Sequence, residues 1–167
     1  SIFVNPTQFG PREDFSRYPR TFAADKNKCL AGGVDVIFCP SADSLYPADF
    51  DTWADTDRLG SKWEGAVRPT HFRGVCTIVL KLLNLVAPTV AVFGQKDYQQ
   101  CQIIKQMVQD FHLPVKIIMH PTVREPDGEV IRRIAAEREK GIHRASWDLR
   151  WPPATPTEVE EKERSRW

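Results

Sequence analysis

One short segment of the chain has the residue types needed to bind a phosphate. Phe93-Gly94-Gln95-Lys96-Asp97 follows an apolar run and precedes a predicted helix. Its glycine permits close backbone approach, its lysine supplies a mobile charge, and a helix N-terminus directs N–H groups to the same place. The alternative is a routine turn from strand to helix, with Asp97 as the capping residue and Lys96 in solvent.

A second segment combines two guanidinium groups and an imidazole just before a predicted helix. In Arg68-Pro69-Thr70-His71-Phe72-Arg73-Gly74, arginine offers a planar fork of donors and histidine offers a donor or a proton carrier. This composition suits a carboxylate or a phosphate ligand. The alternative is a helix cap with solvated arginines.

A third segment, Asn5-Pro6-Thr7-Gln8-Phe9, follows the apolar run Ile2-Phe3-Val4. Its amides can bind hydroxyl and carboxylate groups without adding charge, as specific recognition of a small molecule requires. The alternative is an Asx turn that closes a strand. The sequence contains neither a G-x-x-x-x-G-K-[ST] loop nor a G-x-G-x-x-G turn after a strand, so a P-loop or a standard dinucleotide site is not supported.

The elements that position these segments alternate between helix and strand. Helix-forming residues that end at Gly32-Gly33 predict a helix from residue 21 to 31. Apolar spacing predicts helices from 72 to 86 and after Asp97, the last with an apolar stripe formed by Cys101, Ile104, Met107, Val108 and Phe111. Short apolar runs predict strands at residues 2–4, 34–39, 90–93 and 115–119.

This alternation predicts an α/β fold, a Rossmann-like parallel sheet with flanking helices, because parallel strands need a helical crossover. Ligands of such sheets bind beyond the carboxyl ends of the strands. The segments 5–8, 94–97 and 121–124 are therefore expected to converge on one crevice.

Composition and charge narrow the function further. Lys+Arg 23 against Asp+Glu 22 gives a formal charge of +1, which provides no basic field for a nucleic-acid backbone. No apolar run approaches the roughly 20 residues that cross a bilayer, so we expect no membrane partner.

The cysteines are widely spaced and lie in or beside apolar runs, at Cys29, Cys39, Cys76 and Cys101. This pattern predicts buried thiols in a reducing compartment, the cytoplasm. The histidines lack metal-ligand spacing, so a structural metal site is not expected.

The sequence changes character after Asp127-Gly128. Charged residues are frequent from Glu129 onward, and three prolines interrupt any regular element. We therefore predict a partial ligand-binding domain at residues 1–128 and a divergent, poorly ordered tail at 129–167, in which residues 131–140 could form one charged helix. Because the chain opens with Ser1 inside a predicted strand, we expect its natural start to lie upstream.

Five motifs in order make the sequence similar to a known enzyme family. Four of them are Ser1-Ile-Phe-Val-Asn-Pro-Thr-Gln-Phe-Gly, Tyr18-Pro-Arg-Thr, Glu64-Gly-Ala-Val-Arg-Pro-Thr-His-Phe-Arg-Gly-Val and Phe93-Gly-Gln-Lys-Asp-Tyr-Gln-Gln. The fifth is Pro121-Thr-Val-Arg-Glu-Pro-Asp-Gly. Together they resemble the pantothenate synthetases, or pantoate–β-alanine ligases, over residues 1–128.

The resemblance implies a nucleotidyltransferase-like fold and an ATP-dependent condensation. The pantoate carboxylate would attack the α-phosphorus of ATP to give pantoyl adenylate and pyrophosphate, and the β-alanine amine would then displace AMP to give pantothenate. Mg²⁺ would screen the phosphates. The intact family member is expected to be a cytoplasmic homodimer that binds pantoate, β-alanine and ATP.

The resemblance also implies roles for individual residues. Those expected to bind pantoate are Gln8 and Gln100, with Asn5 beside them; those expected to contact the nucleotide are Gly94, Gln95, Lys96, Asp97 and Val123. Lys96 would stabilise phosphate charge in the transition state, while Arg68 and His71 would surround the pantoate and β-alanine region. Asp25 matches a metal-associated acidic position, although Ala24 replaces a carboxylate often found beside it.

Two family motifs are not found in this sequence. One is the H-x-G-H motif, which in the family precedes the position of Ser1 and binds ATP phosphates. The other is a Ser-Ser-Arg-Asn stretch, replaced here by Glu129-Val130-Ile131-Arg132-Arg133. A shifted reading frame after Gly128 would explain the abrupt change, and translation of the other two frames tests it. We expect little pantoate-dependent ATP–pyrophosphate exchange from this polypeptide, so a non-catalytic remnant of the enzyme is the alternative function. A different adenylating enzyme of similar fold is disfavoured by the segments around Gln8 and Arg68.

Overall fold

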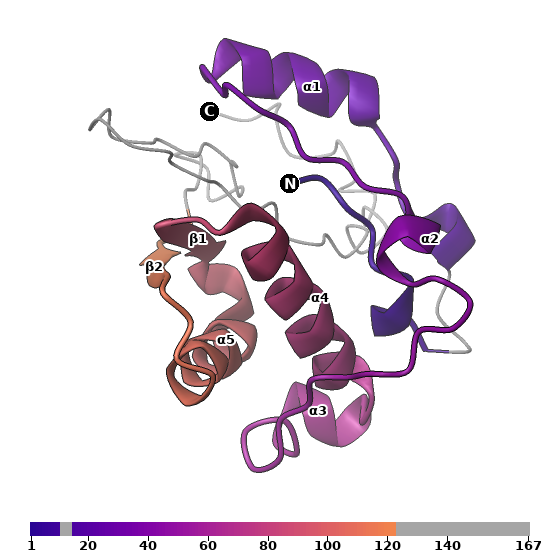
Figure 1. The fold of residues 1–167 in the computed structure, drawn as a ribbon, viewed down its shortest axis with the longest axis vertical. Coiled ribbons are helices and arrows are strands. Elements are labelled where there is room, and N and C mark those ends of the chain that lie inside the picture. The colour runs from indigo at the N-terminus through magenta and orange to yellow at the C-terminus, as the bar shows by residue number, and fades with distance from the viewer. Residues whose placement is uncertain (11–14, 123–167) are drawn as a thin grey trace, which may run out of the picture.

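The computed structural model describes residues 1–10 and 15–122 (Figure 1). The division predicted at residue 128 and the helix predicted at 131–140 lie outside the described residues. The helical elements before the sheet are η1 (Pro6–Gln8), η2 (Phe15–Arg17), α1 (Phe22–Ala31), α2 (Ala42–Leu45), α3 (Glu64–Val67) and α4 (His71–Val86). The sheet region contains β1 (Val90–Gly94), η3 (Gln95–Asp97), α5 (Tyr98–Asp110) and β2 (Lys116–His120).

The β-α-β unit formed by β1, α5 and β2 confirms the predicted α/β class. Strands β1 and β2 pair in parallel, with Val90 opposite Lys116 and Gly94 opposite His120. Helix α5 is the crossover between them, and it packs on α4 (Figure 1). The carboxyl end of β1 therefore leads directly into η3 and α5.

Helix α4 supplies the largest share of the buried core, because its apolar residues fall on one face as the spacing predicts. Phe72 and Val75 in its first turns are buried, as are Val79 and Leu83 further along. The helix ends at Val86, and the next residue, Ala87, adopts a left-handed conformation just before Pro88. None of the described helices is long and apolar enough to cross a membrane.

The stripe predicted on α5 is correct at its start and wrong at its end. Cys101, Ile104 and Met107 are buried, but Phe111 is 53% exposed because the helix stops at Asp110 and the chain turns away. Ile103 is also buried, since α5 contacts both α4 and β1.

Two of the four predicted strands are not formed. Residues 2–4 and 34–39 run beside each other, and the Ile2 N–H donates to the Phe38 carbonyl at 2.9 Å, but they make no ladder of backbone hydrogen bonds. Val36 is 78% exposed, so this segment lacks the two-sided cover that its apolar sequence predicts. Helix α1, which precedes it, likewise buries none of its residues.

An aromatic cluster holds the loop between α2 and α3 against α4. Tyr46, Phe50 and Trp53 contact one another with ring centroids 5.1 to 6.2 Å apart. The Lys81 ammonium lies 3.9 Å from the Phe50 ring centroid, and the Arg73 guanidinium lies 4.6 Å from that of Trp53. These cation–π contacts fix the path of the chain toward α3.

The prediction of four buried thiols is correct only for Cys76 and Cys101; Cys29 is half-buried and Cys39 is exposed. Burial, followed by the nearby Asp55 carboxylate, raises the pKa of the Cys76 thiol to about 12. We therefore expect Cys39 to react with Ellman's reagent at about pH 8 in the folded protein, and Cys76 to react only after unfolding, because the thiolate is the attacking form. Timed labelling of the native protein and of Cys39→Ser measures this. Equal labelling rates for Cys76 and Cys39 would contradict it.

Candidate active site

The first part of the site is built where η1 packs on the N-terminal half of α4. Asn5 is 1% exposed; its Nδ2 donates to the Gly74 carbonyl at 3.1 Å, and its Oδ1 accepts from the Thr7 hydroxyl at 3.0 Å. A Cβ at Gly74 would lie 2.7 Å from the Thr7 carbonyl oxygen, so only glycine permits this approach. The Asn5 amide therefore holds η1 in place, and its contribution to ligand binding stays a prediction.

Tyr46, which belongs to the aromatic cluster, contacts η1 at Thr7. Its hydroxyl lies 3.4 Å from the Thr7 hydroxyl. Burial raises the pKa of Tyr46, so the phenol keeps its proton at neutral pH.

The contact between η1 and α4 fixes Gln8 beside Arg68 and His71. The Gln8 carbonyl accepts from Arg68 Nη2 at 3.0 Å and lies 3.4 Å from His71 Nδ1. Gln8 is only 6% exposed, and its side-chain Oε1 is buried with no hydrogen-bond partner among the described residues. An unpartnered buried acceptor is costly in a folded protein, so this oxygen points to a donor that a ligand would supply.

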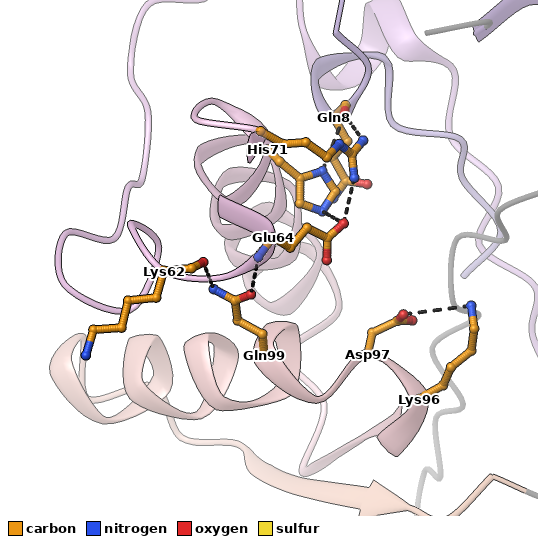
Figure 2. A network of polar contacts seen from close by, with 8 residues as sticks. Gln8, Lys62, Glu64, His71, Lys96, Asp97 and Gln99 are labelled. Atoms are coloured by element: carbon orange, nitrogen blue, oxygen red, sulfur yellow. Dashed lines mark hydrogen bonds and ion pairs between the residues drawn. The ribbon is translucent and has the colours of Figure 1, made fainter. Parts of the chain in front are cut away.

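Glu64 contacts both Arg68 and His71 and was missed by the sequence reasoning. Its Oε1 accepts from Arg68 Nη1 at 2.8 Å and lies 3.8 Å from His71 Nε2 (Figure 2). The spacing of four residues between Glu64 and Arg68 is a recognised signal for a helical ion pair and could have identified the carboxylate. The Glu64 carboxylate thus holds Arg68 and His71 together and neutralises part of the Arg68 charge.

Gln99 connects this cluster to the helix that follows the phosphate-binding candidate. Its Oε1 accepts from the Glu64 N–H at 3.1 Å, and its Nε2 donates to the Lys62 carbonyl at 2.7 Å (Figure 2). The same Nε2 also donates to the Leu59 carbonyl at 3.0 Å. No local sequence pattern predicts the role of Gln99, because its hydrogen-bond partners lie 35 to 40 residues away in the sequence.

The phosphate-binding candidate lies at the carboxyl end of β1, as predicted. Gly94 ends the strand, and Gln95, Lys96 and Asp97 form η3. Lys96 Nζ lies 3.8 Å from Asp97 Oδ1, with the lysine side chain 43% exposed. Asp97 occupies the N-cap position of α5, but its side chain makes no capping hydrogen bond. Its Oδ2 is instead buried without a hydrogen-bond partner in the described part of the chain.

The other predicted site residues lie outside this network. Gln100 is half-buried in the first turn of α5, and Asp25 is half-buried in α1, where its Oδ2 accepts from the Thr21 hydroxyl at 3.1 Å. Within residues 1–10 and 15–122, no hydrogen bond joins Gln100 or Asp25 to the cluster. Val123 lies outside the described residues, as does Arg124, which completes the third predicted loop, so the convergence of all three loops stays a prediction.

The described residues contain no group of three His, Cys, Asp or Glu side chains that could hold a metal ion. Mg²⁺ binds through one or two carboxylates together with water and phosphate oxygens. The half-buried Asp25 carboxylate therefore fits magnesium only in company with phosphates, and no protein-only cage exists in the part described.

The known proteins that are similar to this chain belong to a single enzyme family. The family model described as pantoate-beta-alanine ligase matches residues 1–131. Pantothenate synthetase 1 of Bradyrhizobium diazoefficiens is 58% identical over 128 residues, which are 77% of this chain and 45% of the relative. Pantothenate synthetase of Chloroflexus aggregans is 54% identical over 128 residues, covering 77% of this chain and 46% of its own.

Solved structures agree with the sequence relatives. Pantothenate synthetase from Thermus thermophilus superposes with a TM-score of 0.75 at 47% identity, covering 78% of this chain and 48% of that one. Pantoate-beta-alanine ligase from Francisella tularensis, in complex with beta-gamma ATP and beta-alanine, gives a TM-score of 0.72 at 41% identity, covering 78% and 51%. The chain spans about half the length of the relatives that it matches. The fold, the motifs and both comparisons agree that this chain belongs to the pantoate–β-alanine ligase family.

Proposed function

We propose that this chain carries the pantoate-binding and nucleotide-binding part of a ligase that joins pantoate to β-alanine with ATP. The reaction begins when the pantoate carboxylate attacks the α-phosphorus of ATP, which releases pyrophosphate and leaves pantoyl adenylate. The β-alanine amine then attacks the acyl carbon and displaces AMP. The observation that carries the proposal is the network that links Gln8, Arg68 and His71 to the helix beginning after Lys96 and Asp97.

The substrate side of this proposal rests on Gln8. Its buried Oε1 lacks a donor among the described residues, and pantoate carries hydroxyl groups that can donate to it. Gln100 is the second proposed amide. Arg68 and His71 line the same region and would orient the pantoate carboxylate and the incoming amine. Holding two reactants in the correct orientation is expected to supply much of the acceleration.

The nucleotide side rests on η3. The exposed Lys96 ammonium would stabilise charge on the phosphates, and the buried Asp97 Oδ2 would accept a hydrogen bond from a neutral donor of the nucleotide, such as a ribose hydroxyl. Gly94 and Gln95 would contact the nucleotide through the same turn, and Val123 completes the proposed set. Magnesium, held by Asp25 together with the phosphates, would screen their charge when bound.

A non-catalytic remnant is the second candidate, because Glu129-Val130-Ile131-Arg132-Arg133 stands where the family has Ser-Ser-Arg-Asn. Calorimetric titration with pantoate and with ATP, together with pantoate-dependent ATP–pyrophosphate exchange, separates the two candidates. Pantoate binding with background exchange would indicate a ligand-binding remnant. Exchange above background would indicate a ligase, and no binding of either ligand would contradict both.

We expect Lys96→Ala to weaken ATP binding by about 10-fold to 100-fold, because a hydrogen bond between charged groups contributes about 1.5–3 kcal/mol. Pantoate affinity should change little. Lys116→Ala is the matched control, since Lys116 is exposed at the opposite end of the parallel strands. Equal ATP affinities for the two variants, measured by calorimetry, would remove Lys96 from the site.

The remaining proposals concern the whole protein. We propose a cytoplasmic homodimer, and light scattering of the purified chain tests the oligomeric state.

A further inference from the structure

The turn that begins α3 holds Trp63 in a conformation that favours glycine. Trp63 has φ 46° and ψ −114°, and the Gly65 N–H donates to the Lys62 carbonyl at 3.0 Å. These values are typical of the first central position of a type II′ turn, where a side chain is strained. Trp63 is 73% exposed, so burial of the residue does not offset this strain.

The Gln99 side chain holds both peptide groups that flank Trp63. Its Nε2 donates to the Lys62 carbonyl at 2.7 Å, and its Oε1 accepts from the Glu64 N–H at 3.1 Å. Its remaining N–H donates to the Leu59 carbonyl at 3.0 Å. Because carbonyls only accept and the peptide N–H only donates, these partners allow one orientation of the amide.

The residue fixed by this turn is Glu64, the first residue of α3. Its carboxylate contacts Arg68 Nη1 at 2.8 Å and His71 Nε2 at 3.8 Å, and both of these residues contact the Gln8 carbonyl. A rotation of the peptide before Glu64 would therefore displace the group that aligns Arg68 and His71.

We propose that Gln99 is a positioning residue, which stabilises the strained Trp63 turn and thereby aligns Glu64, Arg68 and His71 with Gln8. The ligand part of this inference rests on the proposed function, while the alignment itself does not. Gln99 belongs to α5, the helix that begins immediately after η3. The amide thus ties the pantoate side of the site to the element that follows the nucleotide side.

The test compares Gln99→Leu, Trp63→Gly and the double variant in the full chain. Gln106→Leu is the matched control, because Gln106 is exposed on the same helix and bonds only to Asp110 in the described part. The first readout is the His71 imidazole signal in proton–carbon correlation spectra, assigned with His71→Gln. The second is pantoate affinity by calorimetry.

We expect Gln99→Leu to shift the His71 signal and to weaken pantoate binding about 10-fold, a size typical of coupled neighbours. Adding Trp63→Gly should return both readouts close to those of Trp63→Gly alone, because glycine adopts this turn without the Gln99 amide. A merely structural role for Gln99 would not give this rescue.

An unmoved His71 signal in folded Gln99→Leu would overturn the proposal, as would failure of glycine to rescue it. If Gln99→Leu does not fold, the double variant decides: a cooperatively folded double variant with the His71 signal of Trp63→Gly supports the proposal, and any other result overturns it. If the unmodified chain does not bind pantoate, the proposed substrate is wrong for this polypeptide, while the His71 signal still tests the alignment.

Discussion

Gly74→Ala is expected to lower the free energy of unfolding by about 2–4 kcal/mol and to abolish pantoate binding. The added Cβ would lie 2.7 Å from the Thr7 carbonyl oxygen and 2.9 Å from its hydroxyl, so η1 must move away from α4. That movement breaks the buried hydrogen bond from Asn5 to the Gly74 carbonyl and separates Gln8 from His71. Urea unfolding followed by circular dichroism measures the loss.

The sign of this effect is diagnostic. Replacing glycine by alanine inside a helix normally adds about 1 kcal/mol of stability. Gly94→Ala is the control, because a Cβ at Gly94 would meet nothing within 4 Å and should change stability by less than about 1 kcal/mol. A Gly74→Ala variant as stable as the unmodified chain would show that η1 is not packed on α4 in solution.

Gln8→Met is expected to change stability and binding in opposite directions. It replaces an unpartnered buried oxygen with apolar atoms of similar length, so the free energy of unfolding should rise by about 1 kcal/mol. Pantoate affinity should fall by about 10-fold to 100-fold, because the acceptor for the substrate hydroxyl is gone. Urea unfolding and calorimetry measure the two effects separately.

The matched control for Gln8→Met is Gln109→Met, at an exposed position late in α5. That variant should leave both quantities unchanged. A Gln8→Met variant that binds pantoate normally would remove Gln8 from the proposed site. A variant that binds weakly and is also destabilised would assign the Gln8 side chain a structural role.

The longer helices and the two paired strands are predictable from the sequence, because the spacing of apolar residues within each element indicates which of its faces is buried. Apolar spacing predicted α4 and α5, and the short apolar runs predicted β1 and β2 to within a residue or two. The same reasoning failed at residues 2–4 and 34–39, because an apolar run gives the preference for a strand but not the partner that completes a ladder.

The motifs also identified the family and predicted that Gln8, Arg68, His71, Lys96 and Asp97 belong to one site. The structure brings Gln8, Arg68 and His71 into direct contact. It places Lys96 and Asp97 immediately before α5, the helix whose Gln99 side chain bonds to Glu64 in the same cluster. Glu64 was within reach of the helical spacing rule, whereas the Asp97 cap was predicted and its side chain does not form it.

The chain's own sequence thus determined the three longer helices, the two parallel strands β1 and β2, the family and most residue types of the site. Only the tertiary structure decided that the Gln99 amide bonds to the Trp63 turn and that Thr7 packs directly against Gly74. The same holds for the Gln8 Oε1, which is buried without a donor in the described part. The physical reason is the separation of the interacting residues along the sequence. Periodicity indicates which face of one element is buried, whereas these features depend on residues that are distant in the sequence and meet only when the elements pack.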